Sequence, residues 1–392
     1  MAGWQGGESG LARGISAAAR LPGALSAKLG KLARYVAAER ATRRLLRQPR
    51  RDGVSAARFF LNDSLGTSGQ LRAGNVAAQM ETLGWQAKVV PGALRLGQRQ
   101  RVIRHFRPDV LIFQSCRHHL NRPEHYPGQT MVFDFDDADF HLDAERRQRD
   151  EAACRSAAGI VCGSRYIQEF AEQLNDRTTV IWTSSPEGRT TRRPQAERPP
   201  VITWAQTRPD SYRLELDFVV DVVTSFARAH GAPFVFRMYD FSDYAESDAK
   251  RRLEAAGVEV EILPLMPYAD FEASLEDVAI GLSPITPQNP FSRGKSFGKI
   301  LAYIDAGVPV ICSDEADHAA FFTPDSGVVT NDPAEWVSQM LQLIGDATAR
   351  QTMADRALER MNGRLRPRHA AERMIAFLDA VLAPAQPSRA SA

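Results

Sequence analysis

The chain has 392 residues, more than one hydrophobic core normally supports, so we expect two domains with extensions. Its 44% hydrophobic and 24% charged residues are typical of a globular protein, and no apolar run is long enough to span a membrane. The formal net charge of +2 argues against nucleic-acid binding by the body, and four cysteines without a CxxC pair indicate reduced, buried thiols in a cytoplasmic protein.

Residues 1–53 form a basic region that we expect to be separate from the body. Leu25, Leu29, Leu32 and Val36 fall at roughly helical spacing, and lysines and arginines lie between them. A basic amphipathic helix of this kind can lie on an anionic membrane surface. A solvated arm, or a helix packed on the body, accounts for the same pattern equally well.

Residues 54–185 alternate between short apolar runs and helical or polar segments. This pattern predicts a Rossmann-like domain, because parallel strands covered on both faces are nearly continuous apolar runs. We predict strands at 59–61, 88–90, 110–113, 131–135, 160–162 and 179–182.

Residues 186–200 are rich in proline and charge and are predicted to link this domain to a second one. The second alternation, 201–366, predicts another Rossmann-like domain. Its strands are expected at 201–204, 234–238, 258–263, 278–282, 308–312 and 328–329. A last helix over 367–384 precedes residues 385–392, whose composition is that of a disordered tail.

Residues 291–314 are the most informative part of the chain. They predict a polar loop, a helix over 295–306, a stop at Gly307 and a buried strand. Within the helix the apolar residues fall on one face, and Lys295 and Lys299 lie a turn apart on the opposite face. Cations at a helix N-terminus favour a ligand that carries phosphate.

These lysines are also compatible with two different roles. Gly294, Lys295 and Ser296 match the end of the phosphate-binding loop of NTPases, but Asn289 stands where that pattern requires glycine. The lysines equally fit the solvated face of a surface helix.

This segment resembles the donor-binding region of group 1 (family 4-like) GT-B glycosyltransferases. The matching residues are Ser283-Pro284, Lys295-Ser296, Lys299 and 306–310, and the resemblance extends more weakly over 57–380. It implies a GT-B α/β fold, in which a cleft separates two Rossmann-like domains and the last helix crosses back to the first. Many members carry two glutamates at the places that Gly294 and Ala302 hold here, and we expect Ala302 on the same face as the lysines.

The resemblance implies a set of ligand-binding residues. The expected donor-binding residues are Ser283, Arg293, Lys295, Ser296, Lys299 and Arg208, the last of which follows the first strand of the second domain. The loop after the first strand of the first domain, with Gly66, Gly69 and Arg72, is expected to face the acceptor or a phosphate.

An acidic run, FDFDDADFHLD at 133–143, follows a predicted strand of the first domain. Because ligands bind beyond the carboxyl ends of parallel strands, Asp136 and Asp137 are candidates to orient or deprotonate an acceptor hydroxyl. Capping of the following helix is the alternative. We predict no metal: Asp134 and Asp136 match a metal motif of another fold only by a short string, and His118, His119 and His125 fit no zinc spacing.

The sequence therefore predicts an enzyme that transfers a sugar from a nucleotide-sugar donor to a hydroxyl of a cell-surface polysaccharide or lipid-linked acceptor. The nucleotide sugar is a co-substrate, and no other cofactor is expected. The expected location is the cytoplasm, with a peripheral contact to an anionic inner membrane face. A catalytically silent scaffold with the same fold is the alternative, and a nucleotide-sugar epimerase is a third candidate.

Overall fold

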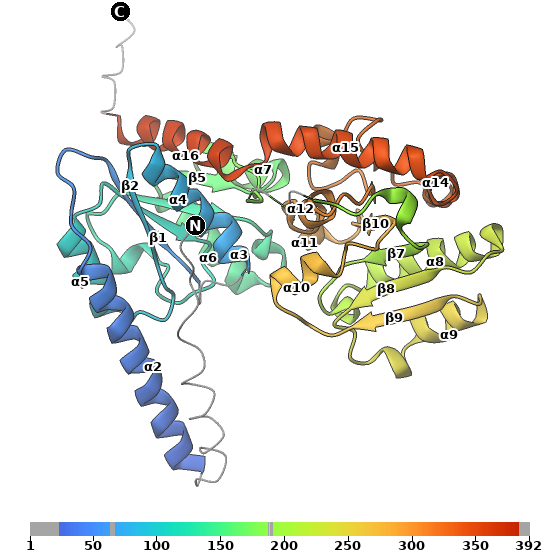
Figure 1. Cartoon of the computed structure of the whole chain (residues 1–392). Coiled ribbons are helices and arrows are strands. Elements are labelled where there is room, and N and C mark those ends of the chain that lie inside the picture. The colour runs from blue at the N-terminus through green and yellow to red at the C-terminus, as the bar shows by residue number, and fades with distance from the viewer. Residues whose placement is uncertain (1–22, 63–66, 187, 189–190, 384–392) are drawn as a thin grey trace, which may run out of the picture.

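A computed structural model describes residues 23–62, 67–186, 188 and 191–383. Within these residues, two parallel six-stranded sheets, each flanked by helices, lie side by side (Figure 1). The predicted fold class, two Rossmann-like α/β domains, is confirmed. Residues 1–22 and 384–392, which include the predicted tail, lie outside the described residues.

The first sheet has the order β2-β1-β3-β4-β5-β6. Its strands are β1 (Ala56–Phe60), β2 (Gln86–Val90), β3 (Val110–Gln114), β4 (Met131–Phe135), β5 (Gly159–Cys162) and β6 (Thr178–Val180). Its helices are α3 (Thr67–Gly69), the π-helical turn η1 (Gln70–Gly74), α4 (Asn75–Thr82), α5 (Leu96–Phe106), α6 (Ala144–Ser156) and α7 (Arg165–Glu172), with 3-10 turns η2 (Pro123–His125) and η3 (Asp139–His141). The central strands β1, β3 and β4 are buried along their whole length, which explains their largely apolar sequence.

The second sheet has the order β12-β11-β10-β7-β8-β9. Its strands are β7 (Val201–Trp204), β8 (Val235–Tyr239), β9 (Glu259–Leu263), β10 (Ile280–Ser283), β11 (Val310–Cys312) and β12 (Val328–Val329). Its helices are α8 (Arg213–His230), α9 (Asp248–Ala255), α10 (Tyr268–Ala273), α11 (Pro290–Arg293), α12 (Gly298–Asp305), α13 (His318–Phe321), α14 (Pro333–Gly345) and α15 (Ala347–Arg364), with 3-10 turns η4 (Gln195–Glu197), η5 (Pro209–Ser211) and η6 (Tyr244–Glu246).

Both sheets have a point at which the strand order reverses. In the first sheet it lies between β1 and β3, and in the second between β7 and β10. Loops that follow such neighbouring strands diverge, and the crevice between them is where open α/β sheets bind ligands. The two crevices mark where a functional site is expected.

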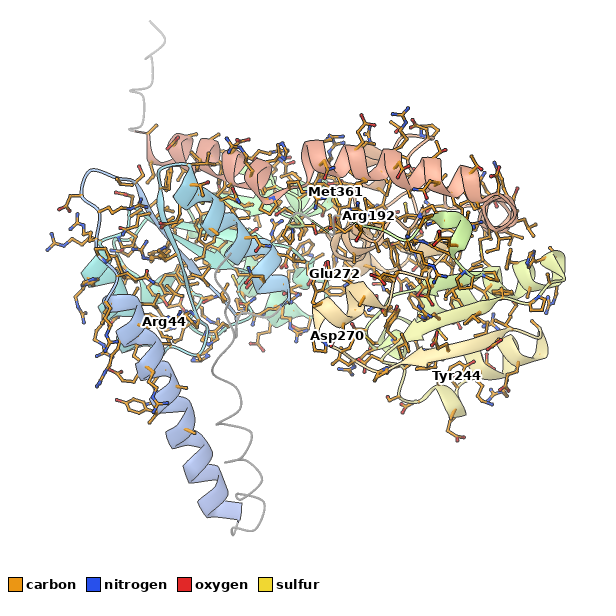
Figure 2. All side chains as sticks on the ribbon, in the orientation of Figure 1. Arg44, Arg192, Tyr244, Asp270, Glu272 and Met361 are labelled. Atoms are coloured by element: carbon orange, nitrogen blue, oxygen red, sulfur yellow. The ribbon has the colours of Figure 1, made fainter. Side chains whose placement is uncertain are left out.

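The chain crosses twice between the domains. The first crossing follows β6, and the second joins α15 to α16 (Pro367–Leu382), which packs on α4 in the first domain. Phe377 and Val381 of α16 cover Gly159, where an added Cβ would lie 2.7 Å from the Phe377 ring, so the glycine permits this close approach. Helices α14, α15 and α16 thus run along one side of both domains (Figure 1), and Met361 of α15 is fully buried in the second-domain core (Figure 2).

Helix α2 (Gly23–Leu46) is the described part of the basic N-terminal region. Its C-terminal half packs on α5, with Ala38 and Thr42 buried and Glu39 paired to Arg101 at 2.6 Å. Its N-terminal half extends away from the body, and Arg44 is exposed near the C-terminal end of the helix (Figures 1 and 2). Among the described residues, no helix is both long and apolar enough to cross a membrane.

The four cysteines are all free and buried, as the sequence predicts.

The helix predicted over 295–306 is wrong at its start, because α12 begins only at Gly298 and the short helix α11 precedes it. Asn289 caps α11 by accepting a hydrogen bond from the Ser292 N–H at 3.3 Å, and the chain turns at Gly294 before α12 begins. Lys295 and Ser296 therefore lie in the loop between two helices.

Candidate functional site

A cavity of about 420 Å³ lies at the carboxyl ends of β7 and β10, where the second sheet reverses its order. Its walls come from both domains. The second domain contributes the loops after β7, β8, β9 and β10 and the loop between α11 and α12, and the first domain contributes α3, η1 and the loop after β4. The size and position are those of a small-molecule site.

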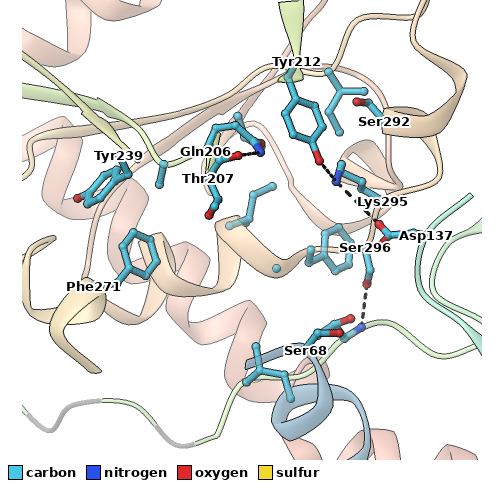
Figure 3. Close-up of a pocket in the computed structure, with 18 of the residues that line it drawn as sticks. Ser68, Asp137, Gln206, Thr207, Tyr212, Tyr239, Phe271, Ser292, Lys295 and Ser296 are labelled. Atoms are coloured by element: carbon cyan, nitrogen blue, oxygen red, sulfur yellow. Dashed lines mark hydrogen bonds and ion pairs between the residues drawn. The ribbon is translucent and has the colours of Figure 1, made fainter. Parts of the chain in front are cut away.

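Lys295 lies in the wall of this cavity, on the side of the second domain (Figure 3). Its Nζ donates to the Tyr212 hydroxyl at 3.0 Å, and it lies 4.8 Å from the Tyr212 ring centroid and 4.9 Å from that of Phe291. Burial lowers the pKa of Lys295, but the charge of Asp137 and the Tyr212 hydroxyl outweigh it, and the net pKa is raised. The ammonium therefore stays charged at neutral pH.

Glu215 of α8 stabilises the segment that leads from β10 towards Lys295. This buried carboxylate accepts from the Asn289 side chain at 3.1 Å and from the Thr286 hydroxyl at 3.3 Å. The contacts hold the segment between β10 and α11, which leads into the loop that carries Lys295.

Asp136 and Asp137 line the cavity from the first domain, directly after β4. Figure 3 shows Asp137 opposite Lys295. Asp136 accepts from the Ser68 hydroxyl at 3.0 Å. Asp137 is held by Arg117 at 2.5 Å and lies 3.8 Å from the Lys295 Nζ. Burial and the charge of Asp137 together raise the pKa of Asp136 to about 6. A carboxylate with this pKa can accept a proton near neutral pH.

Capping does not explain these two carboxylates. Helix α6 is capped by Asp143, whose side chain accepts from the Arg146 N–H at 2.7 Å. Asp134, at the end of β4, is buried and pairs with Arg72, which donates to it through Nε at 3.0 Å. Arg72 thus satisfies the carboxylate that a metal would need, and its guanidinium holds β4 beside the cavity.

The two domains touch at the edge of the cavity. The Ser296 hydroxyl accepts from the Thr183 N–H at 3.0 Å, and the Ser164 hydroxyl donates to the Gly294 carbonyl at 3.3 Å. Gly163 permits the approach, because an added Cβ there would lie 3.0 Å from the Asp136 Cα and 3.4 Å from the Ser296 Cβ. The loop between α11 and α12 of the second domain therefore packs against the acidic run of the first domain.

The structure brings some predicted site residues together and separates others. Ser283, Ser296, Lys295, Asp136, Asp137 and Arg72 all line the cavity. Arg208 is exposed outside the cavity wall, and Arg293 pairs with Glu315 at 3.0 Å in a separate hollow. Gly69 is buried in α3, Gly66 lies outside the described residues, and for Lys299 the structure describes only the backbone, in α12.

The two positions that hold glutamate in many GT-B relatives have no room for one here. At Gly294 an added Cβ would lie 2.4 Å from the Ala138 Cβ of the first domain. Ala302 is fully buried in the core against β10 and β11, which corrects the expectation that it shares a face with Lys295. That expectation assumed one continuous helix through Lys295, and the turn at Gly294 breaks it.

Several cavity residues escaped the sequence analysis. Tyr212, Glu215 and His318 line the cavity, and Tyr239 and Phe271 form an aromatic end, with their ring centroids 5.2 Å apart (Figure 3). Tyr212 and Glu215 stand beside the turn that opens α8, the position after β7 where a phosphate loop is common. Their position after β7 could have indicated a role in the site, but a tyrosine and a glutamate are also ordinary residues at the start of a helix.

Comparison with known proteins agrees with this geometry. Residues 243–376 match the family model described as "Glycosyl transferase-like". No curated protein matches the sequence. Among solved structures, sucrose-phosphate synthase from Thermosynechococcus elongatus superposes with a TM-score of 0.62 and 10% identity, covering 83% of this chain and 99% of its own.

Two further structures show the same arrangement. The lipopolysaccharide outer core galactosyltransferase WaaB has a TM-score of 0.57 and 11% identity, covering 83% of this chain and 99% of its own. S. aureus TarM, in a variant complexed with Fondaparinux, alpha-GlcNAc-glycerol and UDP, has a TM-score of 0.54 and 11% identity over 69% of this chain. This chain spans only 55% of TarM. The chain thus has the GT-B fold of these structures, and residues 243–376 resemble the glycosyltransferase family model, in agreement with the predicted resemblance.

Proposed function

We propose that this protein transfers a sugar from a nucleotide-sugar donor to a hydroxyl group of a glycan or lipid-linked acceptor. The observation that carries the proposal is the meeting of two different charges in one cavity: Lys295 from the second domain faces Asp136 and Asp137 from the first. Transfer needs both, a cation for the leaving diphosphate and a base for the attacking hydroxyl.

On the donor side, Lys295 and the Ser296 hydroxyl face the space in which a diphosphate would lie. As the bond from the sugar to the phosphate oxygen breaks, negative charge grows on the diphosphate, and a fixed ammonium stabilises it. The aromatic pair Tyr239 and Phe271 forms an apolar wall for a nucleobase at the far end of the cavity. Lys299, the second residue of α12, is proposed as a second phosphate contact.

On the acceptor side, Asp136 accepts the proton of the attacking hydroxyl. Its raised pKa of about 6 leaves it mostly ionised at neutral pH and still basic enough to share a proton. Asp137, held by Arg117, supplies a second oxygen to orient the acceptor. Closure of the two domains over bound donor and acceptor would limit the access of water, which otherwise competes as the acceptor.

The acceptor class and the location belong to the same proposal. WaaB acts on lipopolysaccharide according to its name, and TarM was solved with glycan compounds, which supports a glycan or lipid-linked acceptor here. We propose that the protein works in the cytoplasm and that the exposed basic part of α2 touches the anionic inner membrane face.

One observation favours the scaffold alternative. Neither position can hold the glutamate that many relatives have, because Gly294 packs against Ala138 and Ala302 is buried in the core. A silent binding protein would keep donor affinity and lose turnover, so a test of binding has to be joined to a test of turnover.

Replacement of Lys295 and Lys299 by alanine tests the donor site. The loss of charge-assisted contacts is expected to weaken nucleotide diphosphate binding by about 2 kcal/mol or more, measured by calorimetry with UDP, ADP and GDP. Replacement of Lys250, a half-buried lysine of α9 that pairs with Glu254 outside the cavity, serves as the control and is expected to leave the affinity unchanged. Unchanged affinity in a folded double variant would remove the cavity from consideration as a donor site.

A further inference from the structure

The Lys295 ammonium has two possible anionic partners, a donor diphosphate and the Asp137 carboxylate. The Asp137 oxygen lies 3.8 Å from the Lys295 Nζ, and the two side chains are 23% and 21% exposed (Figure 3). Both groups line the same cavity and come from different domains. The pair therefore spans the space in which donor and acceptor would meet.

The surroundings make this contact easy to exchange. On the lysine side, the Tyr212 hydroxyl and the rings of Tyr212 and Phe291 hold the ammonium without neutralising it. On the acidic side, Arg117 binds Asp137 at 2.5 Å and Asp139 at 2.6 Å. Asp137 thus keeps a cationic partner when Lys295 turns to another anion.

We propose that Asp137 is a placeholder for the donor diphosphate: its carboxylate occupies the anion site of Lys295 until a nucleotide diphosphate takes its place. The inference rests on the proposed donor site and adds to it a competition within the protein. The same lysine would neutralise the acceptor-side carboxylate in the empty cavity and the diphosphate in the filled one.

The charged residues around Asp136 and Asp137 determine what happens when a diphosphate displaces Asp137 from Lys295. Arg72 and Arg117 are the cations that remain, and Asp134 and Asp139 are already paired with them. When the donor withdraws Lys295, Asp137 stays bound to Arg117, and the oxygen that faced the ammonium turns to the acceptor hydroxyl. Donor binding would thereby prepare the acceptor side, which gives an order to the two substrates.

The proposal predicts that removal of the Asp137 charge tightens donor binding. In Asp137→Asn the diphosphate no longer competes with a carboxylate, and the dissociation constant for UDP is expected to fall about fivefold or more. Asp143→Asn is the matched control: it removes a charge from the same acidic run, but Asp143 caps α6 and does not line the cavity. Its UDP affinity is expected to stay unchanged.

A double-mutant cycle that combines Asp137→Asn with Lys295→Met separates the placeholder role from the donor site itself. UDP, ADP and GDP are titrated by calorimetry into the full-length protein, and the melting temperature confirms that each variant is folded. The proposal requires that Asp137→Asn tightens binding with Lys295 present and has no effect without it. If Lys295→Met weakens binding but Asp137→Asn leaves it equal or weaker, the placeholder role is wrong and the donor site stands. If Lys295→Met has no effect, or no nucleotide binds, the donor site itself is overturned.

Discussion

At the scale of single residues, the site depends on how neighbouring carboxylates are given different surroundings. Asp134 is neutralised by buried Arg72, Asp137 by Arg117 and Lys295, and Asp136 receives a hydrogen bond from the neutral Ser68 hydroxyl. Burial and the charge of Asp137 then raise the pKa of Asp136. Asp136 thus lies in the cavity with the proton affinity of a base.

Activity is expected to fall as the pH drops through about 6, because Asp136 becomes protonated there and no longer accepts the acceptor proton. Asp136→Asn is expected to lower turnover about 100-fold or more and to leave UDP affinity close to that of the native chain. The measurement is a pH profile of product formation together with calorimetry. Normal specific activity in Asp136→Asn would contradict the assignment.

The same shift has a consequence for stability. Folding raises the pKa of Asp136 from 3.8 to about 6, so the folded state binds this proton more tightly than the unfolded state. The contribution of Asp136 to stability is therefore present at low pH and lost as the pH rises from about 4 to about 6. Asp136→Asn is expected to be at least as stable as the native chain at pH 7.

At the scale of elements, the strands were predictable and the donor loop was not. Strands buried on both faces are largely apolar, and β1, β3, β4, β7 and β10 are all buried along their whole length. The rule that ligands bind beyond strand ends then located Asp136 and Asp137, and the family resemblance located Ser283. The start of α12 was missed because the Ser296 hydroxyl is engaged by Thr183, a contact between residues 113 positions apart that no local pattern records.

The correction at Ala302 can be tested directly. Ala302→Glu would restore the residue type of many relatives, but it would place a carboxylate in a fully buried core. We expect a loss of about 3 kcal/mol or more of folding stability, measured by denaturant unfolding, and no gain in activity. Ala37→Glu on the exposed face of α2 is the matched control. A stable and more active Ala302→Glu variant would show that the side chain faces the donor.

Helix α2 carries the membrane proposal. Arg40, Arg44 and Arg47 are exposed on it or directly after it, and each basic residue near an anionic surface contributes roughly 1 kcal/mol of attraction. Charge reversal of all three to glutamate is expected to abolish sedimentation with phosphatidylserine vesicles at low salt and to leave UDP binding intact. The packed face at Ala38 and Thr42 is untouched by these changes.

The control reverses three exposed arginines on other helices, Arg228, Arg251 and Arg368, and is expected to sediment like the native chain. If the native chain does not sediment with these vesicles, or if both triple variants lose sedimentation equally, the membrane role of α2 is wrong.

At the scale of the whole molecule, both crossings between the domains meet at one buried residue. Asp305, at the end of α12, accepts from the Ser185 hydroxyl of the first crossing at 2.5 Å and from Arg366 of the second at 3.1 Å. Arg366 also donates to the carbonyls of Ser185 and Pro186. Helix α12, which follows the loop that carries Lys295, is thereby tied to both segments that cross between the domains.

The most direct measurement of the central claim is turnover of sugar nucleotides by the full-length chain. The protein is incubated with a panel of UDP-, ADP- and GDP-sugars, and the released nucleotide diphosphate and the fate of the sugar are followed by chromatography. The account predicts slow release of the diphosphate with water as acceptor, lost when Lys295 and Lys299 are alanine and when Asp136 is asparagine. Binding without release in the native chain would contradict it in favour of a scaffold, and an isomerised donor would contradict it in favour of an epimerase.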